Sequence, residues 1–200
     1  MNFLAHLFLS RDNDNLMVGN YLGDFVKGDI NGQYPPSITK GIHLHRQIDS
    51  FTDGHPIRVE QRKLFSKKRR RYAGVILDVA YDHFLSRNWA EFTSESRVRF
   101  IKMVYQVLDN HSEFFPNRAR FFLNWMLTAD ALNKYHQLAG IETAYRLMSG
   151  RGRTHSPLIG ASTEIRDNYY EIREGFLVFF PDLLRQSAVR IKELSADPPS

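Results

Sequence analysis

The sequence predicts an all-α protein, folded as one compact helical bundle. Three observations support this: apolar residues recur at spacings of three and four, strand-like alternation is scarce, and the prolines punctuate the chain as helix ends do. One apolar series of this kind is Val98, Ile101, Val104 and Leu108. With 200 residues, of which 42% are hydrophobic, the chain is long enough to bury a sizeable core.

Nine helices are expected along the chain, with Pro181 kinking or splitting the last one. In chain order, the predicted helices cover 3–9, 14–27, 37–52, 56–66, 70–86, 95–110, 117–127, 129–149 and 162–194. A single domain over 1–194 follows, with 195–200 as a frayed tail.

Composition narrows the class of protein. The chain has no cysteine, so disulfide frameworks and thiolate metal sites are excluded, and a cytoplasmic location is expected. No apolar run approaches the roughly 20 residues that cross a bilayer, and the opening segment lacks a basic region and a cleavage site. We therefore expect no membrane insertion. The net charge of +5 favours an acidic partner.

The first of three segments rich in Asp and His is GNYLGDFVKGD, which contains Asp24. Asp24 lies beside an apolar helical stripe, an unfavourable place for a lone carboxylate. Gly19 and Gly23 are four residues apart and would let another helix approach closely. His6, in the apolar opening helix, is interpreted as a core histidine with satisfied hydrogen bonds.

The second segment is GIHLHRQIDSFTDGHP, and the third is GVILDVAYDHFLSRNW. His45 and Asp49 are four residues apart and share a helix face, as do Asp78 and Asp82. The third segment is nearly apolar all round apart from Asp78, Asp82 and His83. A helix of that kind is buried, and buried carboxylates need a cation or several hydrogen bonds.

These acidic helix faces together favour a metal centre, although each pair alone is more typical of surface or capping interactions. Oxygen-rich ligation with one or two imidazoles suits Mn²⁺ or Mg²⁺, with iron as another alternative. A divalent ion lowers the pKa of a bound water and polarises a phosphoryl oxygen. Arg46, or Arg151 and Arg153, would then steady the phosphate. No serine elbow, Walker loop or GxGxxG motif offers another chemistry.

The basic run of Lys67, Lys68, Arg69, Arg70 and Arg71 is the sharpest charge feature. It is interpreted either as a solvated face or as a surface that steers an acidic substrate. Nucleic-acid binding is disfavoured, because aromatic residues are not interleaved with the charges and no reader motif is present.

Four motifs in order resemble the acyl carrier protein phosphodiesterase family: MNFLAHL, GNYLGDFVKG, GIHLHRQIDSFTD and LDVAYDHFLSRNW, all within residues 1–90. The resemblance implies removal of 4′-phosphopantetheine from holo acyl carrier protein by cleavage of the phosphodiester to its serine. It also implies an all-α fold distantly related to HD phosphohydrolases, with Mn²⁺ as the usual metal. Acyl carrier protein is small and acidic, which agrees with the net charge.

The resemblance implies a set of site residues, although the chain has no His-Asp dipeptide and carries the reverse, Asp82-His83. The predicted metal ligands are Asp24, His45, Asp78 and Asp82. The predicted catalytic groups are Asp49, Asp82, His83 and Arg46, and Lys67 to Arg71 are expected to contact the carrier. Two alternatives stay open: an HD-type phosphohydrolase of nucleotides or small metabolites, and a non-catalytic helical module that binds an acidic partner.

Overall fold

A computed structural model describes residues 1–150 and 156–196, and every regular element in these ranges is helical. The helices are α1 (Phe3–Leu9), α2 (Asp14–Leu22), α3 (Pro36–Gly54), α4 (Pro56–Gln61), α5 (Ala73–Arg87), α6 (Arg97–Asn110), α7 (Asn117–Ala129), α8 (Ala131–Lys134), α9 (Leu138–Met148), α10 (Ala161–Asp167) and α11 (Tyr169–Ala196). The all-α prediction is confirmed. None of the described helices is long and apolar enough to cross a membrane.

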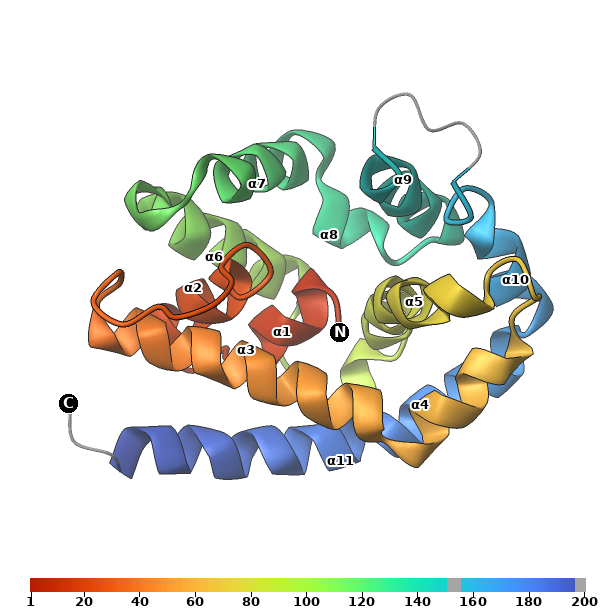
Figure 1. Cartoon of the computed structure of the whole chain (residues 1–200), viewed down its shortest axis with the longest axis horizontal. Coiled ribbons are helices and arrows are strands. Elements are labelled where there is room, and N and C mark those ends of the chain that lie inside the picture. The colour runs from red at the N-terminus through yellow and green to blue at the C-terminus, as the bar shows by residue number, and fades with distance from the viewer. Residues whose placement is uncertain (151–155, 197–200) are drawn as a thin grey trace.

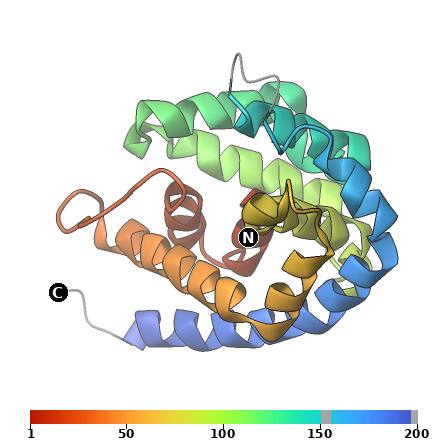
Figure 2. The same cartoon turned by 45° about the vertical axis from the view of Figure 1, so that its right-hand side comes forward.

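Two predicted helices are divided in the structure. The helix predicted over 129–149 is two, because the chain turns between α8 and α9, where Gln137 is extended. Asp130 adopts a left-handed conformation (φ 48°) that separates α7 from α8. The helix predicted over 162–194 breaks at Asn168, between α10 and α11. Pro181 stays inside α11, whose ribbon bends along its length rather than ending there (Figure 2). Residues 151–155, with Arg151 and Arg153, and residues 197–200 lie outside the described residues.

Helix α1 lies in the middle of the molecule, against α2 and α5 (Figure 1). All seven of its residues are buried. Asp82 of α5 accepts hydrogen bonds from the backbone N–H groups of Leu4 (2.8 Å) and Ala5 (3.0 Å). A carboxylate at this end satisfies amide donors that have no partner within the helix. Asp82 therefore anchors α1 to α5.

Helices α2 and α3 pack backbone against backbone. A Cβ atom added at Gly19 would lie 2.0 Å from the carbonyl oxygen of Ile38, and one at Gly41 would lie 2.4 Å from that of Leu16. At Gly23, an added Cβ would lie 2.1 Å from Cγ of His45. The close approach expected at Gly19 is confirmed, and Gly23 leaves room for the His45 ring.

Helix α4 is fixed in place by α11, which also runs beside α3 (Figure 1). The Nε2 group of Gln61 donates to the carbonyl oxygens of Glu171 (3.1 Å) and Ile172 (3.0 Å). Its Oε1 accepts from the hydroxyl of Tyr81 at 2.6 Å, which ties α4 to α5 as well. These contacts set the position of Arg58, one turn earlier on α4.

Candidate active site

Two histidines and one carboxylate from α1 and α3 meet where both imidazole rings are buried and 41% of the Asp49 side chain is exposed. Nε2 of His6 lies 3.2 Å from Oδ1 of Asp49, and Nε2 of His45 lies 3.1 Å from Oδ2 of the same residue. The two imidazole rings stack with their centroids 4.0 Å apart. One ligand atom from each residue lies within 4.8 Å of the others, so this His6–His45–Asp49 cluster has the spacing of a metal-binding group.

Asn20 of α2 contacts the far side of both rings. Its side-chain Oδ1 lies 2.7 Å from Nδ1 of His6, and its backbone oxygen lies 2.8 Å from Nδ1 of His45. Asn20 is completely buried. Both rings are thus held at Nδ1 by α2 while their Nε2 atoms face Asp49.

A second carboxylate, Asp78, extends the cluster towards α4 and α5. The α-amino group of Met1 lies 3.1 Å from Oδ1 of Asp49 and 3.1 Å from Oδ1 of Asp78. The fully buried Arg58 donates through Nη2 to Asp78 and to the backbone oxygen of Gly74 (2.8 Å). Positive groups therefore surround both carboxylates.

The pKa values of the cluster residues are shifted from their ordinary values. Burial, reinforced by the neighbouring His45, lowers the pKa of His6 to about 4. Burial opposes ionisation of Asp49, but the Met1 ammonium and His6 outweigh it and hold the pKa of Asp49 well below its usual range. Burial alone would lower the pKa of His45, yet Asp49 and Asp24 raise it. Groups perturbed in this way concentrate at functional sites.

Among the residues predicted from the sequence, Asp24, His45, Asp49 and Asp78 are brought to this region. Oδ1 of Asp24 lies 3.9 Å from Nε2 of His45, and 38% of its side chain is exposed, which places it at the rim.

Asp82 and His83 are not brought into the cluster. Both carboxylate oxygens of Asp82 accept from α1 amides, so they are used in anchoring that helix. On another face of α5, Nδ1 of His83 lies 2.8 Å from the carbonyl oxygen of Tyr135, and its Nε2 lies 3.1 Å from the hydroxyl of Tyr169. Burial lowers the pKa of His83 to about 4. In this structure both residues contact neighbouring helices and loops rather than the cluster.

Arg46 and Arg69, predicted to contact the phosphate and the carrier, have hydrogen-bond partners within the chain. Arg46 donates to the backbone oxygen of Gly28 at 2.9 Å, on the surface. Arg69 pairs with Glu164 (2.6 Å) and donates to the backbone oxygen of Pro157 (2.9 Å), so it links the basic run to α10. The exposed residues of the run are Lys67, Lys68, Arg70 and Arg71.

Sequence reasoning missed three residues of the site: His6, Asn20 and Arg58. His6 was expected to be a core histidine, and it is buried, but its Nε2 atom faces Asp49. The position of His6 inside the motif MNFLAHL was the one available signal. Asn20 and Arg58 act across helices, and no helical spacing marks them.

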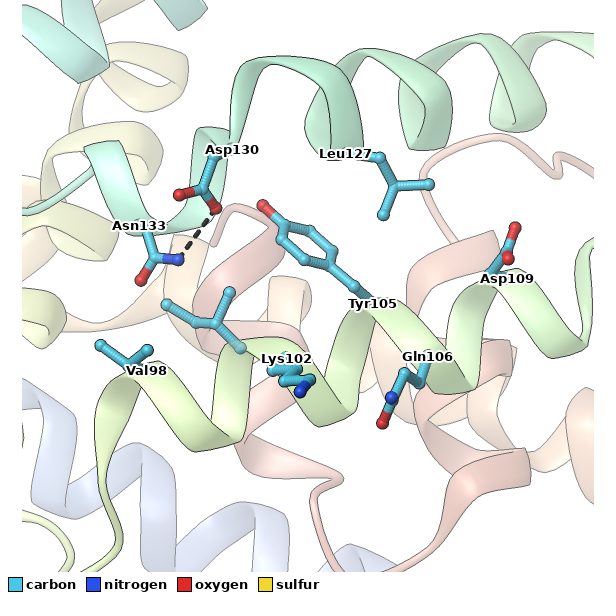
Figure 3. Close-up of a pocket in the computed structure, with 9 residues that line it drawn as sticks. Val98, Lys102, Tyr105, Gln106, Asp109, Leu127, Asp130 and Asn133 are labelled. Atoms are coloured by element: carbon cyan, nitrogen blue, oxygen red, sulfur yellow. Dashed lines mark hydrogen bonds between the residues drawn. The ribbon is translucent and has the colours of Figure 1, made fainter.

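A pocket of about 350 Å³ lies elsewhere, between α6 and the α7–α8 corner (Figure 3). Tyr105 lines it, and its hydroxyl donates to the backbone oxygen of Met126 (3.1 Å). Asn133 donates to Asp130 at its edge (2.8 Å; Figure 3). None of the cluster residues lines this pocket, so we do not assign it to the same chemistry.

Comparison with known proteins decides the family. The family model for acyl carrier protein phosphodiesterase matches residues 1–183, a range that contains the whole cluster. The chain belongs to the acyl carrier protein phosphodiesterase family.

Relatives named acyl carrier protein phosphodiesterase support this membership over nearly the full length. The one from Yersinia pestis is 34% identical over 94% of this chain and 97% of its own. Those from Photorhabdus laumondii and Yersinia enterocolitica are 34% and 35% identical, again over 94% of this chain and over 95% and 97% of their own. No solved structure matches the chain significantly.

Proposed function

We propose that the chain hydrolyses the phosphodiester bond between 4′-phosphopantetheine and the serine of holo acyl carrier protein, giving the apo carrier. The observation that carries the proposal is the convergence of His6, His45 and Asp49 in a member of this family. A distant relation to HD phosphohydrolases stays a prediction from the sequence motifs.

We further propose that the cluster holds a divalent metal, with Mn²⁺ first and Mg²⁺ or iron as alternatives. Nε2 of His6, Nε2 of His45 and the Asp49 carboxylate would hold it, with Asp78 beside the site and Asp24 at its rim. The residues fit such an ion, because two imidazoles and hard oxygen donors form a mixed set without sulfur. The Met1 ammonium, 3.1 Å from both Asp49 and Asp78, supports the same conclusion: this position favours a cation.

When bound, a divalent ion supplies charge neutralisation at the phosphoryl group and a water of lowered pKa. The residues of the chain contribute position and proton transfer. Asp24 lies at the rim of the cluster, with 38% of its side chain exposed. Partial burial of its carboxyl group, with the charge of Asp49 beside it, raises its pKa to about 6, and the adjacent His45 opposes the rise. A carboxyl group whose pKa lies near neutral pH, placed at the rim, is suited to transfer a proton to the leaving serine oxygen.

The carrier is expected to bind through the exposed basic residues Lys67, Lys68, Arg70 and Arg71. They precede α5, the helix that supplies Asp78. Acidic proteins are attracted to such patches over distances near the Debye length, about 8 Å at physiological salt. Arg69 is left out of the contact surface, because its guanidinium is engaged with Glu164.

The test is incubation of the purified chain with holo acyl carrier protein and Mn²⁺, followed by intact-mass spectrometry of the carrier. We expect loss of the phosphopantetheine mass, blocked by EDTA and by Asp49→Asn. Asp53→Asn is the matched control, because Asp53 lies one turn later on α3 and pairs with Arg62 at the surface. An unchanged carrier mass with folded, metal-loaded protein would overturn the proposal and favour a small phosphorylated substrate.

A further inference from the structure

Asn20 holds both histidines of the cluster through two different oxygen atoms, one on its side chain and one on its backbone. We infer that Asn20 is a positioning residue that fixes both rings as Nδ1–H tautomers and turns both Nε2 lone pairs towards Asp49. The tautomers follow from the hydrogen bonds alone. Their use in metal binding rests on the proposed function.

The orientation of the Asn20 amide is settled by its other partners. Its Nδ2 lies 2.7 Å from the backbone oxygen of His6 and 3.3 Å from Oγ of Ser10. A backbone carbonyl only accepts hydrogen bonds, so the amide group facing it must be NH₂. Oδ1 therefore faces the His6 ring, and because this oxygen also only accepts, Nδ1 of His6 must carry the proton.

The same reasoning applies to His45, whose Nδ1 faces the backbone carbonyl of Asn20 at 2.8 Å. In a neutral ring the proton on Nδ1 leaves Nε2 as a bare acceptor. Two such acceptors then face one carboxylate, at 3.2 Å and 3.1 Å. That arrangement is repulsive unless positive charge lies beside the carboxylate, which the Met1 ammonium supplies at 3.1 Å and a bound metal cation would supply between the three groups.

Metal-binding histidines are generally oriented in this manner, by a hydrogen bond at the nitrogen that does not bind the metal. A purely structural role for Asn20, tying α2 to α1 through the same hydrogen bonds, predicts the same tautomers but no change in Mn²⁺ affinity when Asn20 is replaced. The ring tautomers therefore test the assigned hydrogen bonds without metal, substrate or turnover, and the Mn²⁺ affinity separates the two roles.

The experiment is ¹⁵N–¹H NMR of the histidine rings in the full chain, free of metal and at mildly alkaline pH. In the wild type, we expect protonated Nδ1 and unprotonated Nε2 for both His6 and His45. In Asn20→Ala, His6 should move to the Nε2–H tautomer, which donates to Asp49. His45 should not change, because its partner is the backbone carbonyl of residue 20.

Ser10→Ala is the matched control, since it removes a neighbour of the Asn20 NH₂ group but leaves Oδ1 in place. It should preserve both tautomers. Calorimetry with Mn²⁺ supplies a second measurement: Asn20→Ala should bind Mn²⁺ roughly 10- to 100-fold more weakly, the loss typical for an orienting partner, and Ser10→Ala should bind as the wild type does.

An Nε2–H tautomer of His6 in the wild type would overturn the inference. So would an Asn20→Ala variant that keeps both tautomers and full Mn²⁺ affinity. If that variant fails to fold, the wild-type spectrum still decides the tautomers. The proposed function fails separately: a wild type with both Nδ1–H tautomers that leaves holo carrier intact would contradict the activity and leave the role of Asn20 standing.

Discussion

Asp78 and Asp82 lie one turn apart on α5, and both point towards the start of the chain, yet their surroundings differ. Asp82 is fully buried and accepts two backbone N–H groups of α1. Asp78 contacts two cations instead, the Met1 ammonium and the guanidinium of Arg58. On this face, Asp82 thus contacts the scaffold and Asp78 contacts the cluster.

Helical spacing thus predicts that two residues share a face, but it does not predict which groups of other helices each one contacts. A carboxylate against amide N–H groups is satisfied without a metal, since two donors already occupy its oxygens. Asp78, by contrast, lies near a second carboxylate, Asp49, and both are close to positively charged groups. Substitutions at Asp78 and at Asp82 should therefore have different effects on Mn²⁺ binding and on stability.

The largest effect is expected on the cluster side. Asp78→Asn should weaken Mn²⁺ binding and hydrolysis by more than about 100-fold, beyond the usual loss of an outer partner. It also leaves Arg58 buried without its carboxylate, which destabilises the chain. The double variant Asp78→Asn, Arg58→Met should regain stability but not Mn²⁺ affinity, as measured by thermal unfolding and calorimetry. Recovery of both would place Asp78 on the scaffold side.

Asp82→Ala should act on stability instead. Two α1 N–H groups would lose their acceptor in the interior, at about 1–3 kcal/mol each, so the free energy of unfolding should fall by about 4 kcal/mol. The Mn²⁺ affinity of the molecules that remain folded should not change. A loss of affinity as large as that of Asp78→Asn would contradict the division of α5.

The sequence predicted the helical fold and four residues of the candidate site, because both depend on periodicity. Asp24, His45, Asp49 and Asp78 were expected from their helix faces, and the structure places all four in one region. Partners across helices could not be predicted in this way. Arg58 reaches Asp78 from twenty residues earlier in the chain, and no local pattern encodes that contact.

The same limit explains the surroundings of His6 and His83, which differ from those expected from the sequence. Both lie in apolar helices, so burial was predictable for each. What distinguishes them is the partner: Nε2 of His6 meets a carboxylate, whereas Nε2 of His83 meets the Tyr169 hydroxyl. Only the packing of α1 on α3, and of α5 on α11, determines this.

His83→Gln sharpens the scaffold assignment through pH. The pKa of His83 is lowered to about 4 from 6.5, so the unfolded chain takes up the proton first as the pH falls. Its neutral form therefore supports stability above pH 6.5, and that support is lost towards pH 4, by up to about 3 kcal/mol. Urea unfolding at several pH values between 6.5 and 4 should show a smaller decrease in the free energy of unfolding for His83→Gln than for the wild type. An unchanged pH dependence would contradict burial of a neutral ring.

The smallest effect concerns the basic run. The triple variant Lys67→Ala, Lys68→Ala, Arg71→Ala should raise KM for the carrier roughly fivefold, about 1 kcal/mol, with kcat unchanged. The difference should vanish at high salt, because exposed charges are screened. Arg69→Ala is the contrasting control and should lower the melting temperature. An unchanged KM at low salt would move the carrier contact elsewhere.

Anomalous diffraction at the manganese absorption edge, from crystals grown with Mn²⁺, tests the central claim most directly. We expect a peak between Nε2 of His6, Nε2 of His45 and the carboxylate of Asp49. A peak beside Asp82 or His83, or none at the cluster in crystals of active protein, would contradict it.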